Sequence, residues 1–308
     1  MILHKYQEIE KNIEYWQKLF IDNKKVQTNS KYTINTYNRV LEEFKEFCYL
    51  ERVNENEELN FLDMNKYFIN NFIHYLKGKK LSDKTISLYL TTIKLFFKFI
   101  SEENDEAEDI LTPIEKVFIK VSQKEAQSYT DEEIIKIDNY LREIINKSKS
   151  YKKVRNALAV LFLIYTGLRA KELLALKKND IQIEDDVFVI KVLGKGDKER
   201  IVYIEIQTII DEWEKLESFE EYKNNDFIFN IKYTTLYEYN QRICKKLNIQ
   251  NKGLHAYRHH LAIKAVENDT NLQTISEWLG HSNIMITSKY YAKANEKAKK
   301  GMARKIKI

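Results

Sequence analysis

The stretch HAYRHH at residues 255–260 places one arginine among three histidines, and it is followed by LGH at 279–281 and KYY at 289–291. Upstream, TGLR at 166–169 supplies a second arginine and GKG at 194–196 supplies a lysine. These segments contain fixed cations, proton carriers and a phenol, but no paired carboxylates and no cysteine-based zinc spacing. The combination suits one chemistry, in which a phenol attacks a phosphodiester while cations hold the charge that develops on the phosphate.

Each residue type contributes something that this chemistry needs. A phenol has a pKa of ~10, so it attacks only if its proton is taken or its anion is stabilised. The forks of Arg169 and Arg258 can bind phosphate oxygens from two sides without losing their charge. Lys195, on a turn, can protonate a leaving 5′ oxygen, and histidine can move a proton near neutral pH. Fixed cations make a metal unnecessary, so we expect no cofactor and no metal.

A zinc site is the alternative interpretation of the histidines. His255 and His259 lie four residues apart, which places them on one face of a helix. His281 is the only obvious third ligand. This alternative needs a tertiary coincidence, and we rank it below the phosphate chemistry.

Composition predicts a mainly helical protein, but its charge does not by itself establish nucleic-acid binding. The 308 residues include one proline and seven glycines, and 44% are hydrophobic, which suits one or two domains with real cores. The net charge is only +5, but residues 287–308 hold seven lysines, one arginine and one glutamate. Such a basic segment can face phosphates, and a solvated helix face is the equal alternative. Cys48 and Cys244 are far apart and fit a reducing compartment. With no signal peptide or apolar span expected, we expect a cytoplasmic protein without membrane contact.

Apolar spacing predicts a helical bundle over residues 28–105, preceded by an N-terminal extension, 1–27, that forms a short helix or a loose arm. Helices are expected from Lys31, over 65–77 and after the N-cap Ser82. The inward positions of the first and third helices recur every three or four residues: Ile34, Tyr37, Leu41, Phe44 and Cys48, then Ile86, Leu90, Ile93, Phe97 and Ile100.

An acidic stretch and the single proline predict a linker at 106–127, so that the second domain covers 128–308 with a basic C-terminal tail. Thr130 and Glu133 form a capping box that opens it. Helices are expected over 134–145, 154–165 and 172–176. The β-branched runs 187–193 and 200–204 flank a glycine-containing turn and predict a β-hairpin. The remainder is expected to be helical.

The ordered motifs strongly resemble those of the tyrosine recombinase, or phage integrase, family. The matching segments are TGLRAKEL at 166–173, GKGDKER at 194–200, HAYRH at 255–259 and LGH at 279–281, with Tyr290 nine residues after the last histidine. The resemblance covers the chain from about residue 28, and its size is similar to the Xer subgroup or to a short mobile-element integrase. Two positions depart from the family pattern: Tyr257 replaces a leucine, and His260 replaces a serine or threonine.

The resemblance implies a mainly α fold with two domains that close as a C-shaped clamp around duplex DNA. The first would be a SAM-like core-binding bundle, and the second an α+β catalytic domain with a small antiparallel sheet. Lys84 and Lys94, on the third helix of the bundle, are candidate phosphate contacts; ordinary solvated lysines are the equal alternative.

Six catalytic residues are implied by the resemblance: Arg169, Lys195, His255, Arg258, His281 and Tyr290. The two arginines would bind the scissile phosphate, and the lysine would be the general acid. The first histidine would assist proton transfer, and the second would hydrogen-bond the phosphate. Tyr290 would form a 3′-phosphotyrosyl link. Tyr291 is the alternative nucleophile, and Lys198 the alternative acid.

The family's partners follow in the same way. The substrate would be a double-stranded DNA recombination site, on which a homotetramer, or a heterotetramer with a paralogue, exchanges strands through a Holliday junction. A DNA translocase or accessory protein would be an activating partner. Chromosome-dimer resolution and mobile-element integration or excision both fit. A type IB topoisomerase-like enzyme and a catalytically silent DNA-binding protein are the alternative functions.

Overall fold

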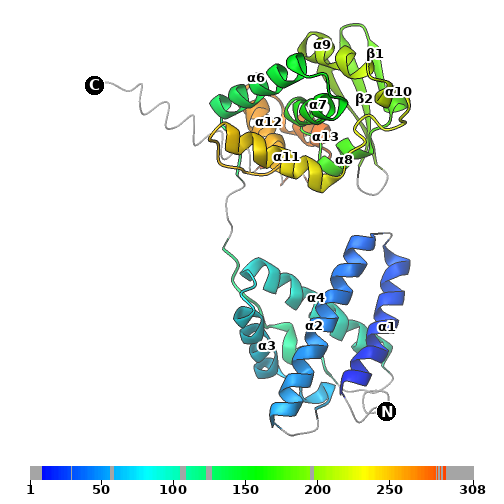
Figure 1. The fold of residues 1–308 in the computed structure, drawn as a ribbon. Helices are drawn as coiled ribbons and strands as arrows, with labels where there is room; N and C mark the ends of the chain where they lie inside the picture. Colours follow the sequence, from blue (N-terminus) through cyan, green and yellow to red (C-terminus); the bar gives the residue numbers. More distant parts are fainter. Residues whose placement is uncertain are drawn as a thin grey trace. The chain divides into compact units, whose positions relative to one another are not determined.

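In the computed structural model, the chain forms two compact units, Met1–Lys124 and Glu125–Ile308 (Figure 1). The residues that the structure describes are 9–28, 30–55, 59–104, 109–122, 127–194, 198–281, 283, 285, 287 and 288. Among these residues, no helix combines the length and the apolar character needed to cross a membrane.

The first unit is helical, as expected. Its elements are α1 (Ile9–Gln27), α2 (Lys31–Glu55), the short 3₁₀ helix η1 (Phe61–Asp63), α3 (Lys66–Gly78), α4 (Asp83–Glu103) and α5 (Thr112–Glu115). Side-chain caps set two of the helix starts. The side chain of Asn65 accepts a hydrogen bond from the backbone N–H of Tyr67 at 2.8 Å, and that of Ser82 accepts one from Thr85 at 3.2 Å.

Aromatic rings fill the core of this unit. The ring centroids of Phe44 and Phe72 lie 5.1 Å apart, and those of Phe20 and Phe96 lie 5.6 Å apart, both edge to face. Such rings bury large apolar areas and favour this geometry. The expected apolar stripe of α2 is buried in this core except for half-buried Tyr37, and Phe44 is fully inaccessible.

Residues expected as an extension, 1–27, form α1 from Ile9 onward and join the same core. Ile13, Trp16 and Phe20 are buried because they recur at helical spacing on one face. From Ile9, therefore, this segment is a helix of the bundle and not a loose arm.

Part of the expected linker, 106–127, also packs on the first unit. Ile110, Ile114 and Val117 are buried in its core. Pro113 lies in the first turn of α5, where its missing N–H costs nothing, so the proline starts a short helix here.

The second unit is built around one central helix. Its helices are α6 (Asp131–Lys147), α7 (Tyr151–Thr166), α8 (Ala170–Ala175), the 3₁₀ helix η2 (Lys178–Asp180), α9 (Ile206–Glu217), α10 (Glu220–Lys223), α11 (Tyr233–Lys246), α12 (His255–Glu267) and α13 (Leu272–Leu279). The expected capping box of Thr130 and Glu133 opens α6. Helix α7 is buried on all sides from Asn156 to Ile164, and α6, α9, α11 and α12 pack against it (Figure 1).

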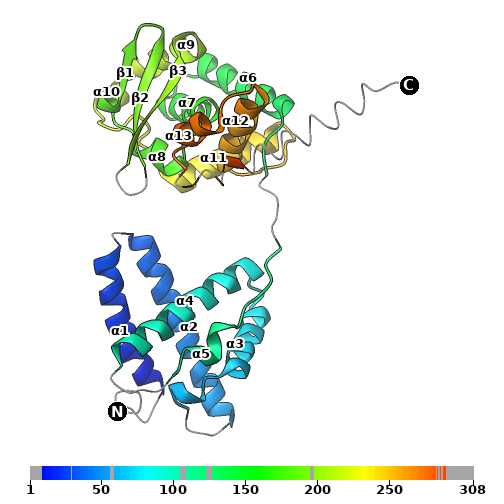
Figure 2. The same cartoon turned by 180° about the vertical axis from the view of Figure 1, so that it is seen from behind.

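A three-stranded antiparallel sheet lies beside these helices in the order β1 (Ile181–Glu184), β2 (Val187–Leu193) and β3 (Glu199–Glu205) (Figure 2). The expected hairpin is confirmed as β2 and β3. Strand β1 was not expected, because its IQIE sequence has no apolar run and its residues remain largely exposed.

Candidate active site

The loop after α7 positions the first arginine. Gly167 ends the helix in the left-handed region, with φ of 64°, and its N–H donates to Leu163 O at 3.1 Å. A Cβ on this glycine would lie 3.1 Å from Leu279 Cδ2, so tight packing adds to the conformational preference for glycine. Arg169 follows at the start of α8, with its side chain 37% exposed.

Helix α12 supplies the second arginine and places it in the interior. Arg258 is 1% exposed, and its Nη1 donates to Gly167 O at 3.0 Å while its Nη2 donates to Leu279 O. His255 lies one turn earlier and is exposed. Its ring meets that of His259 edge to face, with centroids 4.7 Å apart.

The end of α13 brings the histidine of the LGH segment to the same place. Gly280 ends this helix with φ of 61°, and its carbonyl accepts from Arg169 Nη2 at 3.1 Å. The next residue, His281, holds its ring by a hydrogen bond between Nδ1 and Thr287 Oγ1 at 2.8 Å. Both arginines therefore donate to consecutive carbonyls, those of Leu279 and Gly280, immediately before His281.

The electrostatic environment keeps the two site histidines neutral. Burial, followed by the charges of Arg258 and Arg169, lowers the pKa of His281 to about 4. Partial desolvation and the same two arginines lower the pKa of His255. Near pH 7 the arginines provide the charge at this site, while the histidines provide neutral hydrogen-bonding groups.

This arrangement predicts a pH-dependent stability. The unfolded state binds a proton at His281 with a pKa near 6.5, and the folded state only near 4. The unfolded state therefore gains protons as the pH falls through this window, and the free energy of unfolding decreases. In urea unfolding, we expect the free energy of unfolding to decrease less between pH 7 and pH 4.5 in His281→Gln than in the wild type. His74→Gln, which removes an exposed histidine of α3, is the control and should show the same decrease as the wild type. Equal decreases in the wild type and both variants would contradict the lowered pKa of His281.

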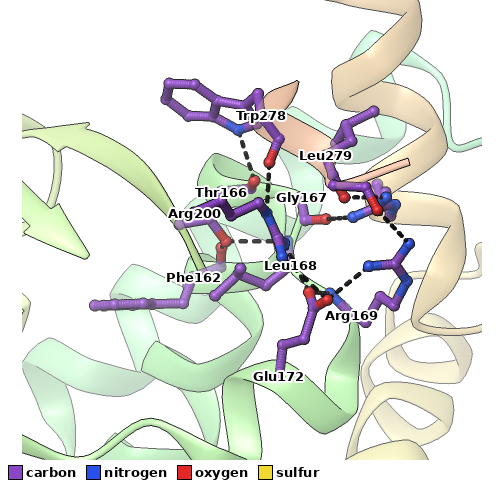
Figure 3. Close-up of polar contacts among 11 residues, drawn as sticks. Phe162, Thr166, Gly167, Leu168, Arg169, Glu172, Arg200, Trp278 and Leu279 are labelled. Atoms are coloured by element: carbon purple, nitrogen blue, oxygen red, sulfur yellow. Dashed lines mark hydrogen bonds and ion pairs between the residues drawn. The ribbon is translucent and has the colours of Figure 1, made fainter. Parts of the chain in front are cut away.

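An ionic cluster formed by Glu172 and Arg200 holds Arg169 in place (Figure 3). Glu172 accepts from Arg169 Nη1 at 2.6 Å and from the Arg169 backbone N–H at 2.8 Å. It also accepts from Arg200 Nη1 and Nη2 of β3, at 3.2 and 2.8 Å. Burial opposes ionisation of Glu172, but the hydrogen bonds from Arg200 and Arg169 outweigh it and lower the pKa of this carboxyl. The carboxylate thus stays charged and fixes the orientation of Arg169.

Glu172 and Arg200 were missed as functional residues in the sequence analysis. Both occur within motifs quoted there: Glu172 in TGLRAKEL and Arg200 at the end of GKGDKER. The available signal was therefore a carboxylate and a guanidinium at fixed positions in two separate motifs. Their pairing needs the fold.

Two departures from the family pattern belong to one buried polar network. Tyr257 is fully buried and donates through its hydroxyl to Asn240 Oδ1 at 2.6 Å. Its ring lies against that of Tyr129, with centroids 4.7 Å apart. His260 Nδ1 lies 3.0 Å from the Tyr129 carbonyl. Both side chains thus fasten α12 to the segment before α6.

Among the predicted catalytic residues, the structure brings together Arg169, His255, Arg258 and His281. Lys195 and Tyr290 lie outside the described residues, as does the alternative nucleophile Tyr291. The alternative acid Lys198 is described; it is exposed, and its carbonyl accepts from Gly194 N–H at 2.8 Å.

The two lysines of α4 differ in their contacts. Lys84 is exposed. Lys94 Nζ donates to Glu115 O at 2.6 Å, so it joins α4 to α5. As for metals, the described part of the chain holds no group of three or more His, Cys, Asp or Glu side chains placed to bind an ion.

Comparisons with known proteins cover both units. The model of the phage integrase family matches residues 133–297, more than half of the chain, and that of the phage integrase SAM-like domain matches residues 13–103. Tyrosine recombinase XerC of Leptospira interrogans serogroup Icterohaemorrhagiae serovar copenhageni (strain Fiocruz L1-130) is 28% identical over 296 residues, which covers 92% of this chain and 90% of the relative. XerC of Staphylococcus aureus (strain MSSA476) is 26% identical over 299 residues, with coverage of 92% and 94%.

The fold is also similar to that of solved structures. The XerH site-specific recombinase, in a post-cleavage complex with palindromic difH substrate, has a TM-score of 0.84. It is 20% identical in sequence and covered, like this chain, over 98% of its length. At that identity the comparison establishes the fold: a SAM-like helical domain and a mostly helical second domain with a small antiparallel sheet.

Proposed function

Because this chain belongs to the phage integrase family of tyrosine recombinases, we propose that it is a site-specific recombinase that cuts and rejoins DNA through a 3′-phosphotyrosyl intermediate. The substrate is a double-stranded recombination site. The enzyme needs no metal and no nucleotide for strand exchange, because the energy of the phosphodiester bond is kept in the covalent link.

One observation carries this proposal. Two arginines from different elements, Arg169 and Arg258, converge on the carbonyls of Leu279 and Gly280, next to His281. The side chain of Arg169 is 37% exposed, and that of Arg258 is held by the buried carbonyl of Gly167. A fixed pair of guanidinium groups beside a neutral imidazole suits the negative charge that develops on a phosphodiester under attack.

In the proposed cleavage step, the hydroxyl oxygen of Tyr290 attacks the scissile phosphorus. The tyrosine–phosphorus bond forms while the bond to the 5′ oxygen breaks, and the leaving oxygen takes a proton from Lys195. His255 assists proton transfer by accepting the proton that the Tyr290 hydroxyl loses, and His281 hydrogen-bonds a phosphate oxygen. Attack by a 5′ hydroxyl from the partner duplex reverses the same steps and restores the free tyrosine.

The biological form of the reaction is the finer part of the proposal. Four protomers on two sites would exchange strands in pairs through a Holliday junction. Similarity to XerC along most of both chains favours chromosome-dimer resolution over mobile-element integration. Exposed Lys84 remains a candidate phosphate contact in the first unit, whereas the bond of Lys94 to Glu115 gives that lysine a structural task.

Strand exchange between two duplexes tests this function. The purified protein is mixed, without metal or ATP, with a supercoiled plasmid and a labelled linear duplex that both carry candidate sites from the source genome. We expect recombinant products whose junctions lie within the sites, and none from a duplex with a scrambled site. A plasmid that is relaxed without any recombinant product would instead indicate the topoisomerase-like alternative.

A further inference from the structure

The side chain of Arg200 joins three elements of the second unit (Figure 3). It begins on β3, opposite Val192 of β2, and is 11% exposed. Its Nε donates to Trp278 O of α13 at 2.8 Å, while Nη1 and Nη2 donate to Glu172 of α8. One guanidinium therefore fastens the sheet to α13, which precedes His281, and to α8, which follows Arg169.

The side chain of Arg200 passes close to the backbone of Gly280. A Cβ on Gly280 would lie 3.0 Å from Arg200 Nη1 and 3.1 Å from Cδ, closer than packed atoms ordinarily approach. Both the positive φ of Gly280 and the close approach of Arg200 therefore favour glycine at this position. A planar fork also suits the carboxylate of Glu172 better than an ammonium would.

Arg200 lies close in sequence to the lysine-bearing turn. Pairing of β2 with β3 continues to Leu193 and Glu199, and Gly194 N–H donates to Lys198 O beyond it. Lys195 lies between these ends in the sequence. Arg200 is the residue after Glu199, so the buried anchor holds the hairpin at the end that carries the lysine.

We propose that Arg200 is a positioning residue, which holds the β2–β3 hairpin against the phosphate site so that Lys195 is aligned for proton donation. Arg200 acts through protein acceptors and does not itself contact the reacting atoms. The inference rests on the proposed function, in which Lys195 is the general acid.

A sulfur leaving group separates this role from a structural one. In a nicked substrate with sulfur in place of the bridging 5′ oxygen, the tyrosine–phosphorus bond forms and the phosphorus–sulfur bond breaks. The thiolate leaves without a proton, because a thiol is a much stronger acid than an alcohol. We expect Arg200→Lys to slow single-turnover cleavage of the oxygen substrate about 10²-fold, the scale of general-acid catalysis, and that of the sulfur substrate less than about threefold. Arg200→Gln, which also removes the counter-charge of Glu172 and so loosens Arg169, should slow both substrates, the oxygen substrate more than the sulfur substrate.

Two further variants make the outcomes distinct. Lys191→Met removes an exposed ion pair with Glu199 on the same hairpin and should cleave both substrates as the wild type does. Equal slowing of an Arg200 variant on both substrates, or no slowing on either, would overturn the inference while leaving the proposed function intact. Failure of sulfur to rescue Lys195→Ala would overturn the acid assignment itself, and with it this role of Arg200.

Discussion

Replacing Arg258 with alanine is expected to slow DNA cleavage about 10³-fold while changing DNA affinity little. The guanidinium is buried and held by the carbonyls of Gly167 and Leu279, so its orientation is fixed before DNA binds. Preorganised donors of this kind contribute mainly to the transition state, and loss of one costs about 10²- to 10³-fold in rate. Affinity depends on many phosphate contacts, of which this is one. Single-turnover cleavage of a nicked substrate and a separate binding titration would measure the two effects.

Two variants serve as controls for this prediction. Arg258→Lys keeps the charge but lacks the fork, so we expect cleavage to stay slow while the fold is retained. Arg155→Ala removes another arginine of the same unit that donates to a backbone carbonyl, that of Asn230, and should cleave normally. Cleavage by Arg258→Ala within threefold of the wild-type rate would show that this residue does not bind the scissile phosphate.

Replacing Glu172 with alanine is expected to lower the free energy of unfolding by about 3 kcal/mol. The carboxylate is buried and is the shared acceptor of Arg169 and Arg200, so its loss leaves a mostly buried guanidinium without its counter-charge. Removing one partner of a buried ion pair typically costs about 3–5 kcal/mol, and the partial exposure of Arg169 places this case at the lower end. Urea unfolding of the wild type and the variant at pH 7 measures the difference.

Variants of graded severity distinguish charge from packing at this position. Glu172→Gln keeps the shape and some of the hydrogen bonds, so its cost should be smaller than that of alanine. Glu220→Ala breaks an exposed ion pair with Lys223 and should cost less than about 1 kcal/mol. A cost for Glu172→Ala no larger than that for Glu220→Ala would show that the cluster does not stabilise the fold.

Local sequence signals predicted much of the fold because they act locally. Ser82 and Thr130 accept backbone hydrogen bonds at the helix starts where capping chemistry places them. The stripe that includes Phe44 is buried because helical spacing puts it on one face. By contrast, burial of α1 depends on a surface supplied by α2 and α4, which its own polar composition does not reveal.

In the candidate site, too, residues within sequence motifs were predicted, whereas contacts that depend on tertiary packing were not. Ordered motifs grouped Arg169, Arg258 and His281, and the structure brings all three together. The bridge between Glu172 and Arg200 was not predicted, since it spans two elements 28 residues apart and depends on how the sheet packs on α8. The lowered pKa of His281 is also a tertiary effect, because it arises from burial and from the charges of arginines on other elements.

The most direct test of the account is the covalent link itself. Wild-type protein and Tyr290→Phe are incubated, without metal or ATP, with nicked DNA that carries the recombination site, then denatured and digested for mass spectrometry. We predict a protein–DNA adduct that survives denaturant, maps to Tyr290 and disappears in Tyr290→Phe. An adduct that persists in Tyr290→Phe and maps to Tyr291, or to any other residue, would contradict it.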